Sequence, residues 1–163
     1  RGALKFVART QDAYIYENAG ALPRVMFVRD WEHANFEHII EGGRWPEFDP
    51  TATVLLDGEP EIAGTSAEVS DIPESSSVII KHYENTIVEI EVEAASEGFV
   101  LLNDVWHPWW TAEVDGKPAT IHRANVMFRA VRVSAGKHRV RFEFTPFSGA
   151  IAELGERLSG GGN

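Results

Sequence analysis

The densest group of chemically active side chains is a short aromatic run in the second half of the chain. Three of the five tryptophans fall within residues 106–110, and His107 lies between them. A tryptophan ring stacks on the apolar face of a sugar ring, while neighbouring polar side chains hydrogen-bond the hydroxyls. The predicted sugar contacts are Trp106, His107, Trp109 and Asp104. The alternative is structural, with one tryptophan in the core and another covering the end of a sheet.

The sequence carries no other local pattern that catalysis or cofactor binding requires. Its six histidines include no HExxH or HxH pair, and it lacks the nucleophile elbow, the P-loop and the dinucleotide-binding glycine motif. We therefore expect no catalytic residue, no metal and no cofactor in this chain. Glu89, Glu91 and Glu93 alternate along one predicted strand, where they form either a calcium-binding ladder or a solvated strand face.

The composition excludes several classes of protein. The chain has 163 residues, with 25 acidic and 15 basic side chains and a formal net charge of -10. Because phosphate binding depends on Lys and Arg, this charge argues against a nucleic-acid partner. The lack of cysteine excludes a disulfide scaffold, and no apolar run approaches the roughly 18 residues of a membrane helix. The chain begins with Arg1 rather than Met, so we expect it to be a piece of a longer protein.

Most of the chain alternates with the period of a β-strand. Residues 86–94 alternate valine and isoleucine with glutamate, and residues 139–144 alternate arginine with valine and phenylalanine. We expect some of the arginines in residues 139–144 to form ion pairs with acidic residues on a neighbouring strand. Asp115-Gly116 predicts a tight hairpin turn, because a type I′ turn needs two residues of positive φ. The other predicted strands span residues 13–17, 24–28, 52–56, 77–83, 99–103, 110–114, 119–122, 126–133 and 137–145. The alternation of residues 126–133 breaks at Ala130-Val131, which indicates a bulge or a twist.

Two short segments have helical spacing. Residues 31–40 form the first predicted helix, with Asp30 as its N-cap and Gly42-Gly43 as its end, and residues 150–158 form the second. The many short strands predict a mostly β fold, an antiparallel β-sandwich of two sheets, jelly-roll or immunoglobulin-like, with one or two short helices. We expect one domain over residues 1–158 and a flexible tail over residues 159–163.

Four segments resemble, in the same order, motifs of the YfhO-like bacterial polytopic membrane proteins. The four family motifs are Tyr16-Glu17-Asn18 with Ala21-Leu22-Pro23-Arg24; Tyr83 and Asn85 with the alternating strand after them; Val100-Leu101-Leu102 with Trp110 to Lys117; and Ala124-Asn125, Phe128-Arg129-Ala130-Val131, Ala135-Gly136-Lys137-His138 and Phe144-Thr145-Pro146. The chain departs from the family pattern at Trp109, where the family has glycine.

The resemblance implies a role at the cell envelope. The family is similar to membrane-embedded glycosyltransferases that use lipid-linked sugars, and its presumed catalytic acids lie between membrane helices. This chain would then be the family's β-rich, non-catalytic domain on the extracytoplasmic side of the cell membrane. Its expected partners are a glycan or lipid-linked sugar and the transmembrane part of the same chain.

Two other functions remain open at this stage. The domain is alternatively a structural or protein-interaction module that packs on the membrane part or on a partner without binding sugar. A third hypothesis, a secreted glycan-active enzyme or its binding module, needs two carboxylates about 5–10 Å apart in a cleft. The positions of the three clustered tryptophans discriminate between sugar and protein binding, since a groove favours a sugar and a flat patch favours a protein.

Overall fold

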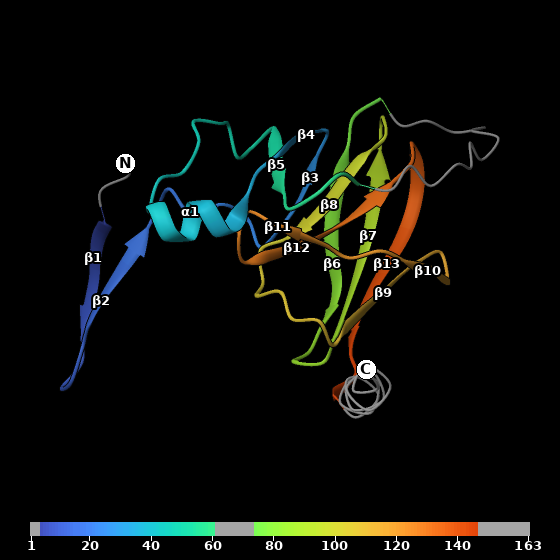
Figure 1. Cartoon of the computed structure of the whole chain (residues 1–163). Coiled ribbons are helices and arrows are strands. Elements are labelled where there is room, and N and C mark those ends of the chain that lie inside the picture. Colours follow the sequence, from blue (N-terminus) through green and yellow to red (C-terminus); the bar gives the residue numbers. More distant parts are fainter. Residues whose placement is uncertain (1–3, 61–73, 147–163) are drawn as a thin grey trace, which may run out of the picture.

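The computed structural model describes residues 4–60 and 74–146 (Figure 1). Its strands form a five-stranded sheet, a six-stranded sheet and a separate two-stranded hairpin. The hairpin consists of β1 (Leu4–Arg9) and β2 (Tyr14–Asn18). The mostly β architecture of packed antiparallel sheets confirms the predicted β-sandwich.

The five-stranded sheet is antiparallel throughout and has the order β10-β9-β13-β7-β6. Its strands are β6 (Ser77–Tyr83), β7 (Ile87–Ala94), β9 (Trp110–Val114), β10 (Lys117–Ala119) and β13 (Gly136–Phe144). The turn between β9 and β10 is the predicted one, with φ values of 54° at Asp115 and 74° at Gly116. The Asp115 carboxylate also accepts a hydrogen bond from the Arg139 backbone N–H at 2.8 Å, which fixes this turn to β13.

The six-stranded sheet has the order β3-β8-β12-β11-β5-β4, with only β4 and β5 parallel. Its strands are β3 (Val25–Val28), β4 (Asp30–His33), β5 (Thr53–Leu56), β8 (Gly98–Leu102), β11 (His122–Ala124) and β12 (Phe128–Val133). The two edge strands, β3 and β4, are separated in sequence by Arg29 alone. The sheet must therefore curl until its edges meet. The curl encloses a buried cluster of Val28, Val54, Leu56, Phe99, Leu101, Ala124 and Ala130.

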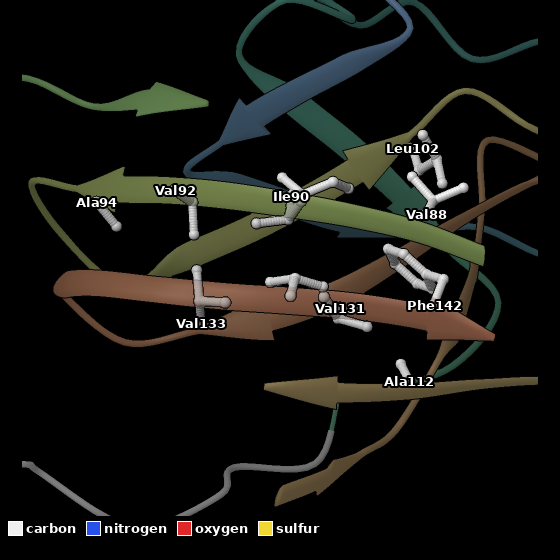
Figure 2. Close-up of a cluster of buried hydrophobic side chains, with 11 residues drawn as sticks. Val88, Ile90, Val92, Ala94, Leu102, Ala112, Val131, Val133 and Phe142 are labelled. Carbon is white, nitrogen blue, oxygen red and sulfur yellow. The ribbon is translucent and has the colours of Figure 1, made fainter. Parts of the chain in front are cut away.

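The main core lies between the two sheets. Figure 2 shows Val88, Ile90 and Val92 of β7 facing side chains of the six-stranded sheet, as the alternation of residues 86–94 predicts. The full buried cluster is Val88, Ile90, Val92, Ala94, Val100, Leu102, Ala112, Val131, Val133, Val140 and Phe142. Burial of this apolar surface is the dominant favourable contribution to folding.

The glutamates on the other face of β7 form ion pairs with basic residues of the neighbouring strands. The pair that includes Arg141 confirms the ion pairing expected for the arginines of residues 139–144. The pairs are Glu89 with Arg141 at 2.8 Å, Glu91 with Lys81 at 3.2 Å and Glu93 with Lys137 at 3.0 Å. Within the described residues, no group of three histidine or acidic side chains is placed to hold a metal ion. The glutamate ladder therefore works here as a row of cross-strand pairs.

The first predicted helix is wrong in its first half. Residues 30–33 form β4, which pairs in parallel with β5, and the helix α1 (Phe36–Gly42) starts later. Its N-cap is Asn35 rather than Asp30, and the Asn35 Oδ1 accepts a hydrogen bond from the His38 N–H at 2.9 Å. Pairing with a distant strand overrides the local helical spacing. The predicted end is confirmed, because Gly43 closes the helix at φ 62°.

Three other differences concern strands. The predicted strand 119–122 is divided between β10 and β11, because the chain crosses there from one sheet to the other. Of the bulge or twist expected at Ala130-Val131, the bulge is absent, because β12 pairs in regular register with β8 and β11. The apparent break in alternation arises because β12 is buried on both faces, with Val131 toward the main core and Ala130 inside the curl. Strand β1 was not predicted.

Some predictions fall outside the described residues. The second helix, residues 150–158, and the tail, residues 159–163, are not described, and the single domain over residues 1–158 stays a prediction. Among the described residues, no helix is long and apolar enough to cross a membrane.

Candidate functional site

The four predicted sugar contacts lie in the segment 103–109, which connects β8 to β9. Hydrogen bonds fix this segment at its start and its middle: the Asn103 N–H donates to the Arg24 carbonyl at 2.8 Å, and the Trp106 N–H donates to the Met127 carbonyl at 2.7 Å. The Trp110 N–H then donates to the His107 carbonyl at 3.1 Å, which closes a tight turn before β9. In Figure 1 the segment lies at the same end of the sandwich as the turn between β6 and β7.

A hollow of about 390 Å³ opens beside this segment. Its lining residues are Trp106, His107, Pro108, Trp110, Thr111, Ala112, Pro118, Ala119 and Ile121. We call it the tryptophan hollow. Trp106 and Trp110 are half-buried there, while His107 is exposed. None of the described lining residues is an aspartate or a glutamate.

The structure separates the four predicted residues. Trp106 and His107 line the tryptophan hollow. Trp109 is not among its described lining residues; its ring lies 4.9 Å from the His107 ring and 6.1 Å from the Phe144 ring, measured between centroids. Asp104 lines a different pocket. Sequence reasoning missed Trp110 as a lining residue, and Trp110 also packs against the main core.

Asp104 belongs to a cluster of polar side chains contributed by both sheets. Its Oδ1 accepts a hydrogen bond from Arg24 Nη1 at 2.7 Å, and its Oδ2 accepts one from the Tyr83 hydroxyl at 2.9 Å. Arg24 Nη1 also donates to the Tyr83 hydroxyl at 2.6 Å. Burial, followed by the hydrogen bond to Asp104, raises the pKa of Tyr83 above its ordinary value.

Arg129 completes this cluster from β12. Its side chain is 2% exposed, and its guanidinium carbon lies 3.8 Å from the centroid of the Trp110 ring and 5.4 Å from that of Phe142. Its Nη1 donates to the Val105 carbonyl at 2.7 Å, and its Nη2 lies 3.7 Å from Asp104 Oδ2. Burial lowers the pKa of Arg129. The buried Nε finds no hydrogen-bond acceptor among the described residues, and the two aromatic faces offset part of that cost.

We call Arg24, Tyr83, Asp104, Trp110 and Arg129 the arginine cluster. It borders a polar pocket of about 200 Å³, lined by Tyr83, Glu84, Asn85, Val88, Asp104, Val105, Trp110 and Arg129. Trp110 is therefore a wall of both this pocket and the tryptophan hollow. Residues 104–105 line the polar pocket and residues 106–108 line the hollow, so one loop separates the two.

Each of the four family motifs contributes one side chain to the arginine cluster. Arg24 comes from the first motif, Tyr83 from the second, Trp110 from the third and Arg129 from the fourth. Segments spread over more than a hundred residues thus meet at one end of the sandwich. No single motif predicts that these four side chains come together, because each residue taken alone has an ordinary structural explanation.

The comparison with protein families supports the same assignment. The model of the family described as "Bacterial membrane protein YfhO" matches residues 66–151, which is more than half of the chain. This chain belongs to the YfhO family of bacterial membrane proteins. No curated protein and no solved structure matches it.

The YfhO match contains most of the site. It covers the tryptophan hollow and, in the arginine cluster, Tyr83, Asp104, Trp110 and Arg129. Arg24 lies before the matched region, although its side chain is bound to Tyr83 and Asp104. The part of the chain that the YfhO family shares is therefore the part that builds both pockets.

Proposed function

We propose that this chain is a recognition domain of a YfhO membrane protein, which binds a glycan or a lipid-linked sugar on the extracytoplasmic side of the membrane. The observation that carries the proposal is the tryptophan hollow, in which Trp106, His107 and Trp110 line one concavity. Aromatic faces combined with a few polar groups are the usual lining of a small-molecule site.

The two parts of the site have different roles in this proposal. The parts of the Trp106 and Trp110 rings that line the hollow offer apolar surface to a sugar ring, and the exposed imidazole of His107 hydrogen-bonds a hydroxyl. Both Asp104 oxygens already accept hydrogen bonds inside the arginine cluster. Asp104 then holds the segment 103–109 in place, and direct sugar contact by Asp104 or Trp109 stays a prediction.

The proposal assigns no catalysis to this domain. Glycoside hydrolysis commonly uses a pair of carboxylates beside the bound sugar, and the described lining of the tryptophan hollow contains none. The chemistry of the parent protein would then belong to other parts of it. The domain would supply affinity for the sugar or its acceptor.

A calorimetric titration of the purified chain with a panel of cell-envelope oligosaccharides tests this function. We expect micromolar to millimolar binding by the native chain, and at least a roughly tenfold loss for Trp106→Ala, since stacking contributes about 1 kcal/mol or more. Trp45→Ala is the matched control, because Trp45 is an exposed tryptophan that stacks on Phe48 away from the hollow. Absence of binding by a folded sample, or an equal loss in both variants, contradicts sugar recognition here.

A second candidate function uses the same hollow for protein docking. Most of its lining side chains are apolar, including Pro108, Ala112 and Ile121, and such a surface also accepts a protein side chain. The domain would then pack on the transmembrane part of the same protein without binding sugar. In that case glycans fail to bind, while Trp106→Ala weakens the association of the separately produced domain with the membrane part.

A further inference from the structure

The hairpin of β1 and β2 stands apart from the sandwich. Within the described residues, these two strands pair only with each other, and in Figure 1 they project on the side of α1, away from the five-stranded sheet. A two-stranded hairpin alone is only marginally stable in water, and it gains stability by packing against another apolar surface. The hairpin therefore needs a partner beyond its own two strands.

One face of the hairpin is aromatic and exposed. Phe6 pairs across the strands with Tyr16, with ring centroids 5.8 Å apart, and the Tyr14 ring lies 6.5 Å from Phe6. More than half of each of these side chains is exposed. We call Phe6, Tyr14 and Tyr16 the aromatic face. Such a contiguous exposed patch marks an interaction surface.

Exposed apolar side chains are concentrated in this part of the chain. Among the described residues, ten of the fourteen large apolar side chains that are exposed lie between Leu4 and Trp45. These ten are Leu4, Phe6, Val7, Tyr14, Ile15, Tyr16, Leu22, Trp31, Ile40 and Trp45. Five of them are aromatic, and four of those are tyrosine or tryptophan, the residues that gather at the interface between membrane and water.

The charge pattern allows the hairpin to approach an anionic membrane surface. Residues 1–40 hold five acids and five bases, and the hairpin itself holds two of each. Residues 41–97 hold fourteen acids and two bases, so their net charge is -12. An anionic lipid surface repels the acidic middle of the chain, whereas it repels neither the neutral N-terminal part nor residues 98–163, which hold six acids and eight bases.

We propose that the aromatic face lies in the headgroup layer of the membrane that carries this YfhO protein, with the hairpin lying flat on the bilayer. The tyrosine hydroxyls then meet the polar headgroups, while the rings and Phe6 lie against the acyl boundary. The partner is a phospholipid surface. This inference is independent of sugar binding, since it uses neither the tryptophan hollow nor the arginine cluster.

Labelled cysteine variants test the lipid contact directly. The chain has no cysteine, so a single introduced thiol carries an environment-sensitive dye at one chosen position. Leu4→Cys places the dye two residues from Phe6 on the same side of β1, and Ile79→Cys places it on the similarly exposed outer side of β6. On adding vesicles of phosphatidylethanolamine and phosphatidylglycerol, we expect a blue shift of the emission for Leu4→Cys and none for Ile79→Cys. Equal shifts, or no shift, overturn the proposal.

Vesicle co-sedimentation measures the contribution of the rings. We expect the double variant Phe6→Ser, Tyr16→Ser to lower the partition coefficient by roughly tenfold or more, because two half-exposed aromatic side chains lose their apolar contact. The control Ile79→Ser should partition as the native chain does. Native chain that stays in the supernatant overturns the proposal. A dimer that the double variant abolishes also overturns it, since the aromatic face would then bind a second copy.

Discussion

The buried guanidinium of Arg129 stacks on the half-buried ring of Trp110, with 3.8 Å between the guanidinium carbon and the ring centroid. Arg129 comes from β12 of the six-stranded sheet, and Trp110 begins β9 of the five-stranded sheet. The contact therefore joins the two layers at the end where both pockets open. Trp110 forms a wall of each pocket, and its ring is in contact with Arg129.

Replacement of Arg129 by alanine should be strongly destabilising. The change removes the stacking on Trp110 and the hydrogen bond to the Val105 carbonyl, and it leaves a buried cavity. We expect the free energy of unfolding in urea to fall by about 3 kcal/mol. Arg129→Lys keeps the charge but loses the planar stacking, so it should recover only part of that loss.

Arg139→Ala is the matched control for this prediction, because Arg139 is an exposed arginine on β13. Its unfolding free energy should stay within about 0.5 kcal/mol of the native value. Equal stability of Arg129→Ala and Arg139→Ala would mean that the arginine cluster does not hold the sheets together.

Tyr83→Phe removes a single hydroxyl from the arginine cluster. That hydroxyl donates to Asp104 and accepts from Arg24, so both hydrogen bonds disappear while the ring remains. We expect a loss of about 1 kcal/mol in unfolding free energy, modest because the tyrosine is partly exposed. Tyr14→Phe, at an exposed position of the hairpin, should be neutral. A larger loss for Tyr14→Phe would contradict the assignment.

The raised pKa of Tyr83 predicts a loss of stability in alkali. The folded protein holds the phenolic proton more tightly than the unfolded chain does, whose pKa is near 10.0. This contribution to the unfolding free energy is therefore complete below pH 10.0 and decreases as the pH rises through the folded pKa. Urea unfolding of the native chain and Tyr83→Phe at neutral and alkaline pH isolates the effect. The difference in unfolding free energy between the native chain and Tyr83→Phe should decrease above pH 10.0, and a difference that does not change with pH would refute the prediction.

Gly98 is a position where a methyl group does not fit. A Cβ there would lie 2.6 Å from Phe27 Cζ and 2.7 Å from the Val28 carbonyl oxygen, because β3 and β8 approach closely at this point. Gly98→Ala should lower the unfolding free energy by about 2 kcal/mol. Gly42→Ala, which meets nothing within 4 Å, should leave stability unchanged or slightly raised. Equal effects of the two changes would contradict the packing described here.

Local pattern in the sequence was enough to predict the elements that depend on near neighbours. Residues 86–94 alternate between apolar and acidic because one face of β7 is buried and the glutamates of the other face pair with basic side chains on neighbouring strands. The turn at Asp115-Gly116 was predictable because aspartate and glycine readily adopt the positive φ that a type I′ turn requires at both positions. The clustering of the tryptophans indicated the loop that borders the hollow.

Features that depend on distant segments could not be predicted in this way. Residues 31–40 have helical spacing, and the pairing of Asp30–His33 with β5 makes the first of them a strand. Arg129 is a charged residue on the face of β12 that also carries Val131 and Val133 of the main core. Its burial requires Trp110 and Asp104 from other elements, and no local rule brings those together. Asp104 was placed in the sugar site by sequence proximity alone.

Nitrogen-15 NMR of the tryptophan side chains tests sugar recognition most directly. The chain has five tryptophans, so its spectrum holds five indole N–H signals, two from the hollow (Trp106 and Trp110), one from Trp109 and two from distant positions (Trp31 and Trp45). On titration with a glycan that binds, the account predicts shifts of the Trp106 and Trp110 signals while those of Trp31 and Trp45 stay fixed. Shifts confined to Trp31 and Trp45, or no shift with any glycan of the panel, would contradict it.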